Sequence, residues 1–191
     1  MINYLIRMES VESVVWETKV PLRISVSASD AANCAISLPL HLSLPAISFL
    51  PIISSQVQKH FMPEDADSKV WFSFQGSPIR YILYQLWCHI SWHVIRGSYF
   101  RWHLPVGILL DLYRVQTDLW MITVHFSDFP YSEIEPLDSS AVESSFRMAV
   151  KEADQIRTRS ERTNQFQTAD YKRLWASVRE ASLAEWKEVG E

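Results

Sequence analysis

The most informative alternation of hydrophobic and polar positions lies in residues 101–129, where it predicts a strand, a helix and a second strand. Arg101 to Leu104 is a short extended piece, and Pro105 suits the first turn of a helix because its φ is fixed and no N–H is needed there. Helical spacing follows in four apolar residues, Ile108, Leu109, Leu112 and Tyr113. From Leu119 the period becomes two, which predicts a strand whose buried face carries Trp120, Ile122, Val124 and Phe126.

The same criterion predicts further elements before this unit. Alternation predicts strands at Leu22–Val26 and Leu38–Leu44, which we expect to form a hairpin. Apolar residues three or four apart predict helices at Val11–Trp16 and Leu50–Phe61. Val70–Phe74 alternates as a third strand, before a turn at Gly76, Ser77 and Pro78.

This order of elements predicts an α+β fold of the β-grasp (ubiquitin-like) type, in which one face of a mixed sheet packs on a helix. We expect an N-terminal helix in residues 1–16, a ubiquitin-like domain in residues 17–130 and a helical extension in residues 131–191. A chain of 191 residues is long enough to bury a hydrophobic core of this kind.

The extension is predicted to hold two helices, Asp138–Ser160 and Thr168–Val189, the second capped by Thr168. The apolar stripe of the first contains Val142, Phe146, Ala149, Val150, Ala153 and Ile156. The second presents Tyr171, Leu174, Trp175, Val178 and Trp186. The two tryptophans of the second helix either pack on the sheet domain or serve as a face for a partner, and the sequence leaves both readings open.

Residues 81–100 do not fit this plan. A connection of this length between two strands of a compact domain is uncommon, and its histidines and arginine make it a poor membrane span. We interpret the segment as an atypical insertion.

Composition restricts the class of function. The 18 basic and 22 acidic residues give a net charge of −4, which offers no electrostatic case for binding nucleic acid. Cys34 and Cys88 are far apart, so no disulfide framework is indicated and a reducing compartment is expected. No segment reads as a signal peptide, and we expect a cytoplasmic protein.

The sequence gives only weak signals for catalytic or metal-binding groups. Cys88, His89 and His93 have a spacing that can hold zinc, but no second pair of ligands lies nearby in sequence and all three fall in the insertion. His125, Ser127 and Asp128 include the residue types of a catalytic triad, yet neighbours on one strand point to opposite faces. We therefore expect no cofactor, no metal and no enzyme activity of the chain's own.

Several segments together resemble one known family: LHLSLPAISFLPIISSQVQKHF, VWFSFQGSPIR, RWHLPVGILLDLY, LWMITVHFSDFP, FRMAVKEAD and KRLWASV. In this order they resemble the N-terminal part of the autophagy protein 5 family, over roughly Val14 to Val178 apart from the insertion. The resemblance implies a ubiquitin-like domain followed by part of a helix-rich region, with a second ubiquitin-like domain missing. Family members join the equivalents of Arg80 and Trp102 almost directly, so the insertion is interpreted as retained non-coding sequence or an unusual splice form.

The resemblance also implies a function. Family members accept the ubiquitin-like autophagy protein 12 through an isopeptide bond, bind autophagy protein 16 and promote transfer of autophagy protein 8 to phosphatidylethanolamine at the preautophagosomal membrane. The acceptor lysine lies in a KEAD motif, which here begins at Lys151. Membrane contact is expected to be peripheral and through the complex, and the missing domain weakens the expectation for autophagy protein 16.

The residues themselves are consistent with this role for Lys151. At about 100° per residue, Lys151 points roughly 140° away from Phe146 and so away from the apolar stripe. The plainer reading is one more solvated lysine on a helix. The alternative for the whole chain is a truncated or misannotated family fragment that has no activity, or that competes for autophagy protein 12.

Overall fold

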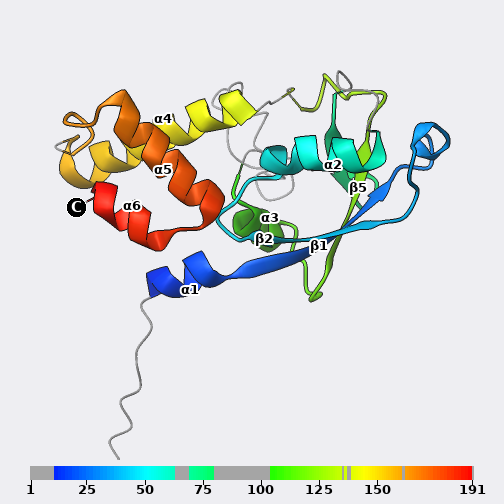
Figure 1. Ribbon diagram of the computed structural model, residues 1–191, viewed down its shortest axis with the longest axis horizontal. Helices are drawn as coiled ribbons and strands as arrows, with labels where there is room; N and C mark the ends of the chain where they lie inside the picture. Colours follow the sequence, from blue (N-terminus) through cyan, green and yellow to red (C-terminus); the bar gives the residue numbers. More distant parts are fainter. Residues whose placement is uncertain are drawn as a thin grey trace, which may run out of the picture.

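The protein is described by a computed structural model that covers residues 11–62, 69–79, 104–134, 136, 139–160 and 162–190. The first half contains α1 (Val11–Glu17), β1 (Lys19–Val26), η1 (Ala31–Asn33), β2 (Leu40–Pro45), η2 (Leu50–Ile53), α2 (Ser54–Phe61), β3 (Trp71–Phe74) and β4 (Ser77–Pro78). The second half contains α3 (Val106–Leu112), β5 (Trp120–His125), α4 (Ser139–Thr158), α5 (Thr168–Glu180) and α6 (Leu183–Gly190). The sheet occupies one end of the molecule, and α4, α5 and α6 form the other end (Figure 1).

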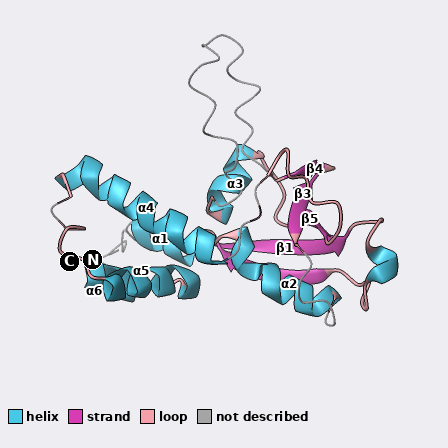
Figure 2. Cartoon of the chain, turned by 90° about the horizontal axis from the view of Figure 1, so that it is seen from above, coloured by secondary structure: helices cyan, strands magenta, loops and turns pink. Residues whose placement is uncertain are grey.

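The described strands form one mixed sheet of five, in the order β2-β1-β5-β3-β4. β1 pairs antiparallel with β2, with Leu22 opposite Leu42, and parallel with β5, with Leu22 opposite Trp120. β3 pairs antiparallel with both β5 and β4. The parallel pair of β1 and β5 is flanked by β2 on one side and by β3 and β4 on the other. With a helix across one face, this is the predicted β-grasp arrangement, and Figure 2 shows α2 lying over the sheet.

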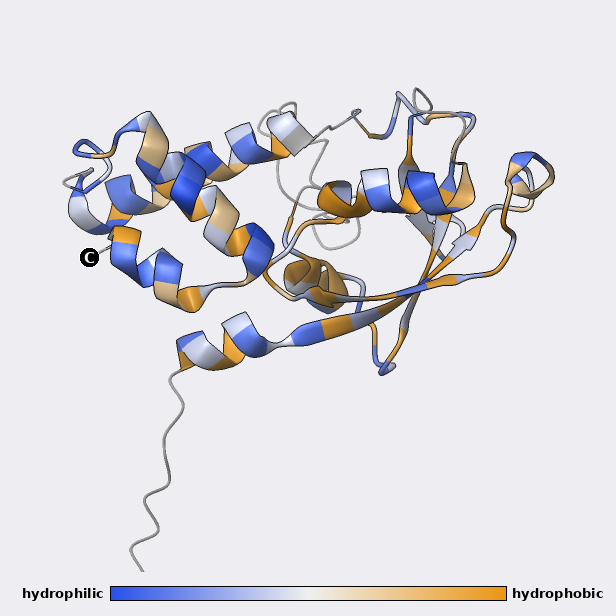
Figure 3. Ribbon diagram, viewed as in Figure 1, coloured by the Kyte–Doolittle hydropathy of each residue, from blue (hydrophilic) through white to orange (hydrophobic). Residues whose placement is uncertain are grey.

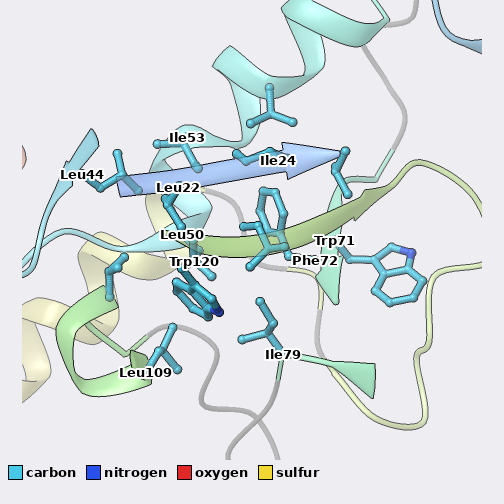
Figure 4. Close-up of a cluster of buried hydrophobic side chains, with 14 of the residues drawn as sticks. Leu22, Ile24, Leu44, Leu50, Ile53, Trp71, Phe72, Ile79, Leu109 and Trp120 are labelled. Atoms are coloured by element: carbon cyan, nitrogen blue, oxygen red, sulfur yellow. The ribbon is translucent and has the colours of Figure 1, made fainter. Parts of the chain in front are cut away.

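The hydrophobic core lies between the sheet and the helical segments η2, α2 and α3. Period-two alternation places Leu22, Ile24 and Trp120 on the inner face, where they are fully buried. Leu50, Val57 and Leu109 reach the same core from the helical layer, and Figure 4 shows Leu22, Ile24, Leu50, Leu109 and Trp120 converging on it. Trp120, predicted to be a core residue, is only 1% exposed.

The end of the sheet differs from the prediction in one strand. The expected turn is present, because Gln75 and Gly76 both have positive φ, of 50° and 78°. That geometry is typical of a two-residue hairpin loop, and it brings Ser77 and Pro78 back along β3 as a strand where only a turn was predicted. The extended piece predicted at 101–104 lies outside the described residues except for Leu104.

The start of α3 is shifted by one residue. Pro105 was predicted in the first helical turn, but it has an extended ψ of 143° and precedes the helix, which begins at Val106. Pro105 forms an isolated bridge with Phe49, and the N–H of Val106 donates to the carbonyl of Ser48 over 2.7 Å. These contacts with the loop before η2 hold Pro105 extended, which its sequence neighbours do not reveal.

Three predictions for the C-terminal helices differ from the structure. The single helix expected at 168–189 is broken, because Ala181 adopts the left-handed conformation with φ 53° between α5 and α6. The residue before α5 is Gln167, whose N–H donates to the Asp170 carboxylate over 2.8 Å, so Thr168 lies inside the helix and does not cap it. On α4 the predicted apolar stripe holds only in part, since Ile156 is 85% exposed.

A chain of aromatic side chains joins the helical end to the sheet end. Trp175 of α5 packs on Phe49, with ring centroids 5.7 Å apart, and on Phe146 of α4, at 5.3 Å. Trp186 of α6 contacts Phe146 and also Trp16 of α1, at 5.5 Å. Trp175 therefore packs on the sheet domain, which is one of the two readings of the sequence, whereas Trp186 packs against α1 and α4 and is half-buried. Figure 3 shows hydrophilic residues alternating with hydrophobic ones along the ribbons of α4 to α6.

Candidate functional site

The candidate acceptor lysine lies in the second half of α4. One face of this helix packs toward α5 and η2 through Val142, which is buried, and Phe146, which is half-buried. Lys151 lies on a different face and is exposed, as its angle from Phe146 predicts. Its role as an isopeptide acceptor stays a prediction, but the geometry leaves the side chain reachable.

The amine of Lys151 lies over an aromatic ring of the neighbouring helix. Its Nζ is 5.3 Å from the ring centroid of Tyr171, in the first turn of α5. Tyr171 is only 7% exposed, so its ring is largely enclosed by the rest of the molecule. A cation within about 6 Å of a ring centroid is attracted by the negative face of the ring.

Asp154, three residues after Lys151 and the last residue of the KEAD motif, organises the connection between α4 and α5. Its carboxylate accepts a hydrogen bond from the hydroxyl of Thr158 and a second, of 2.8 Å, from the backbone N–H of Thr163. The connection needs such support because Arg159 and Ser160 both have positive φ, which non-glycine residues rarely adopt. Asp154 thereby fixes the loop beside Tyr171.

The charges of this cluster follow from these contacts. Hydrogen bonds from Thr158 and from the backbone N–H of Thr163 hold the pKa of Asp154 below its ordinary value, so it is ionised at neutral pH. Burial raises the pKa of Tyr171, and the negative charge of Asp154 raises it further, so the phenol is neutral. The amine of Lys151 therefore lies over an uncharged ring.

The sequence did not point to Tyr171 as part of this site. Tyr171 reads as one member of the apolar face of its own helix, and twenty residues separate it from Lys151. Only the antiparallel packing of α4 and α5 brings the two together (Figure 1). Asp154 belongs to the KEAD motif, but nothing in the motif indicates that its carboxylate binds the connection between α4 and α5.

A second polar cluster lies at the end of β5 and contains His125 and Ser127, two of the residues considered above as a catalytic triad. Ser73 Oγ and His125 Nε2 are 2.8 Å apart, and the His125 ring stacks on Trp71 with centroids 3.7 Å apart. Ser127 instead donates to the carboxylate of Asp30 over 2.6 Å. His125 and Ser127 thus have different hydrogen-bond partners, Ser73 and Asp30.

Other residues singled out in the sequence lie outside the described part of the chain. They are Cys88, His89, His93 and Trp102. Among the residues that the structure does describe, no group of three or more His, Cys, Asp or Glu side chains is arranged to hold a metal ion. Within the same residues, no helix combines the length and the apolar character needed to cross a bilayer.

Comparison with known families assigns both ends of the molecule. The sequence model described as "Autophagy protein ATG5, UblA domain" matches residues 15–85 and 85–126, more than half of the chain. The model described as "Autophagy protein ATG5, alpha-helical bundle region" matches residues 139–191. The chain belongs to the autophagy protein 5 family.

Individual members of the autophagy protein 5 family support this assignment. Autophagy protein 5 of Aspergillus fumigatus is 28% identical over 218 residues, covering 99% of this chain and 60% of the relative. The Drosophila melanogaster protein is 27% identical over 172 residues, covering 86% of this chain and 56% of the relative. The chain therefore spans less than two thirds of the length of these relatives.

A solved structure shares the fold. The crystal structure of Kluyveromyces marxianus Atg5 superimposes with a TM-score of 0.71 at 18% sequence identity, covering 95% of this chain and 68% of that chain. The likeness extends over both the sheet and the helical end, which confirms the α+β, ubiquitin-like class predicted from the order of elements.

Proposed function

We propose that this protein is an acceptor for covalent attachment of autophagy protein 12, and that Lys151 supplies the amine. Family membership provides the reaction, and the KEAD motif provides the residue. The observation that supports the choice most directly is the exposure of Lys151 on α4, beside a loop held by the motif's own Asp154. An acceptor amine must be reachable by the thioester of a conjugating enzyme.

The wider role follows from the same family. We infer that the conjugate promotes lipidation of autophagy protein 8 in autophagosome formation, with peripheral membrane contact through the complex and no catalytic residues of the chain's own. Binding of autophagy protein 16, which is expected for the family, is part of this proposal. The division into a ubiquitin-like domain at 17–130 and a partial helix-rich region at 131–191 is also proposed.

The decisive experiment is reconstitution of the full chain with autophagy protein 12 and its activating and conjugating enzymes. We expect one covalent adduct whose isopeptide bond maps to Lys151 by mass spectrometry. Lys151→Arg keeps the positive charge but provides no primary amine, so the adduct should disappear. Lys172→Arg, at an exposed lysine on the facing helix α5, is the matched control and should leave the adduct unchanged.

Two results would contradict the assignment. A full yield of adduct from Lys151→Arg would show that another amine is the acceptor. No adduct from the wild-type chain, combined with inhibition of the conjugation of a longer family member, would favour the alternative in which this chain competes for autophagy protein 12.

A further inference from the structure

We propose that Tyr171 is a positioning residue for the Lys151 amine, an inference that rests on the proposed acceptor function. The observation behind it is the placement of Lys151 Nζ 5.3 Å from the centroid of the Tyr171 ring. An exposed lysine has four freely rotating side-chain bonds and samples many directions. A ring fixed beneath the amine restricts that sampling to one side of α4.

The Tyr171 ring is itself held in place by neighbouring groups. Phe166 meets it edge to face, with centroids 5.6 Å apart and planes at 74°. The phenol O–H donates to the carbonyl of Thr163 over 3.4 Å, while the N–H of the same Thr163 is bound to Asp154 of α4. Through Thr163, Tyr171 is thus connected to Asp154 on the helix that carries Lys151.

The chemistry of a ring face suits a nucleophile better than a carboxylate would. A carboxylate accepts strong hydrogen bonds from the ammonium and stabilises its charged form. A ring face attracts the ammonium more weakly and provides no acceptor oxygen. Tyr171 therefore directs the amine of Lys151, and the conjugating enzyme provides the group that removes its proton.

The transfer that this arrangement serves is an ordinary aminolysis of a thioester. Lys151 loses one proton, and the nitrogen lone pair attacks the thioester carbonyl that joins the modifier's C-terminal glycine to the cysteine of its conjugating enzyme. The C–N bond forms, the C–S bond breaks, and the cysteine leaves as a thiolate. The nitrogen loses a second proton as the amide forms; one of the two released protons binds the thiolate sulfur and the other goes to solvent. Tyr171 exchanges no proton in this sequence.

Two variants distinguish the contribution of the Tyr171 ring from that of its hydroxyl. Tyr171→Phe keeps the ring, so its conjugation rate should lie within about two-fold of the wild type. Tyr171→Leu keeps an apolar side chain without a ring, and its kcat for transfer should fall by about two- to five-fold, with KM for the acceptor unchanged. Equal rates for Tyr171→Leu and wild type, or an equal loss in both variants, would overturn the role of the ring.

A measurement that needs no conjugation tests the geometry by itself. The ring current of Tyr171 should move the ε-methylene protons of Lys151 upfield in NMR spectra of the full chain, and the shift should persist in Tyr171→Phe. Random-coil shifts for these protons in the wild type would overturn the proposal even if Tyr171→Leu fails to fold. Loss of the adduct in Lys151→Arg together with a wild-type rate in a folded Tyr171→Leu would remove this inference and leave the acceptor function intact.

Discussion

At the scale of single residues, Asp30 shows how a buried charge ties two distant parts of the chain together. Its side chain lies in the loop after β1, and it accepts hydrogen bonds from Ser27 and Ser127 and from the backbone N–H of Phe126. Burial alone would raise the pKa of Asp30, but these three donors, helped by the nearby His125, hold it below the ordinary value. The ionised carboxylate is therefore the form that stabilises the fold.

We predict that Asp30→Asn lowers the free energy of unfolding by roughly 2–3 kcal/mol at pH 7, because charge-assisted hydrogen bonds become neutral or are lost. An acid with a lowered folded pKa stabilises the fold above its unfolded pKa of about 3.9, and this stabilisation is lost as the pH falls through the folded pKa. The difference between wild type and variant, measured by urea unfolding, should therefore shrink below about pH 4. A constant difference from pH 7 to acid would contradict this account.

At the scale of elements, the break between α5 and α6 decides where the last helix lies. The N–H of Ser182 donates to the carbonyl of Ser177 over 2.8 Å, while Ala181 stands in the left-handed conformation, as in a Schellman motif. The hydroxyl of Ser182 then accepts from the N–H of Glu185 at the start of α6. The Ser-x-x-Glu spacing of these two residues is a helix-start signature that was visible in the sequence.

We predict that Ala181→Gly stabilises the protein by about 1 kcal/mol, because glycine adopts the left-handed conformation without a steric penalty from Cβ. Ala176→Gly, inside α5, is the matched control and should destabilise by a similar amount, since glycine is a poor helix former. Thermal melts of the two variants should therefore move in opposite directions. A lower melting temperature for Ala181→Gly would show that the left-handed residue is not strained.

At the scale of the whole molecule, the aromatic chain holds the helical end on the sheet end. Trp175 is its central member, 5% exposed and packed between Phe49 before η2 and Phe146 of α4. The ion pair of Lys187 with Glu12, at 3.0 Å, adds a surface contact between α6 and α1. Exposed pairs contribute little, so the placement of α4 and of Lys151 depends mainly on the aromatic packing.

We predict that Trp175→Ala lowers the free energy of unfolding by about 3–5 kcal/mol, the usual cost of removing a large buried side chain. Unfolding followed by tryptophan fluorescence and by circular dichroism should then cease to coincide, because the helical end loses its main contact with the sheet. Met148→Ala, at an exposed position on α4, should change stability by less than about 0.5 kcal/mol. Coincident transitions in Trp175→Ala would show that other contacts couple the two ends.

The sequence by itself determined the elements whose own residues carry the signal. Period-two alternation located β1, β2, β3 and β5 and the buried faces of β1 and β5, and helical spacing located α2, α3 and α4, so the β-grasp order followed. The exposure of Lys151 followed from the angle between two residues on one helix. In each case the cause is a local repeat that neighbouring residues contain.

Tertiary structure decided what depends on residues far apart in the chain. The extended Pro105, the burial of Trp175 and the exposure of Ile156 each depend on which segment lies opposite. Tyr171 lies beneath Lys151 for the same reason, because α5 turns back along α4. A periodic pattern records that a face is apolar and not what covers it, so these contacts appear only when the helices are packed.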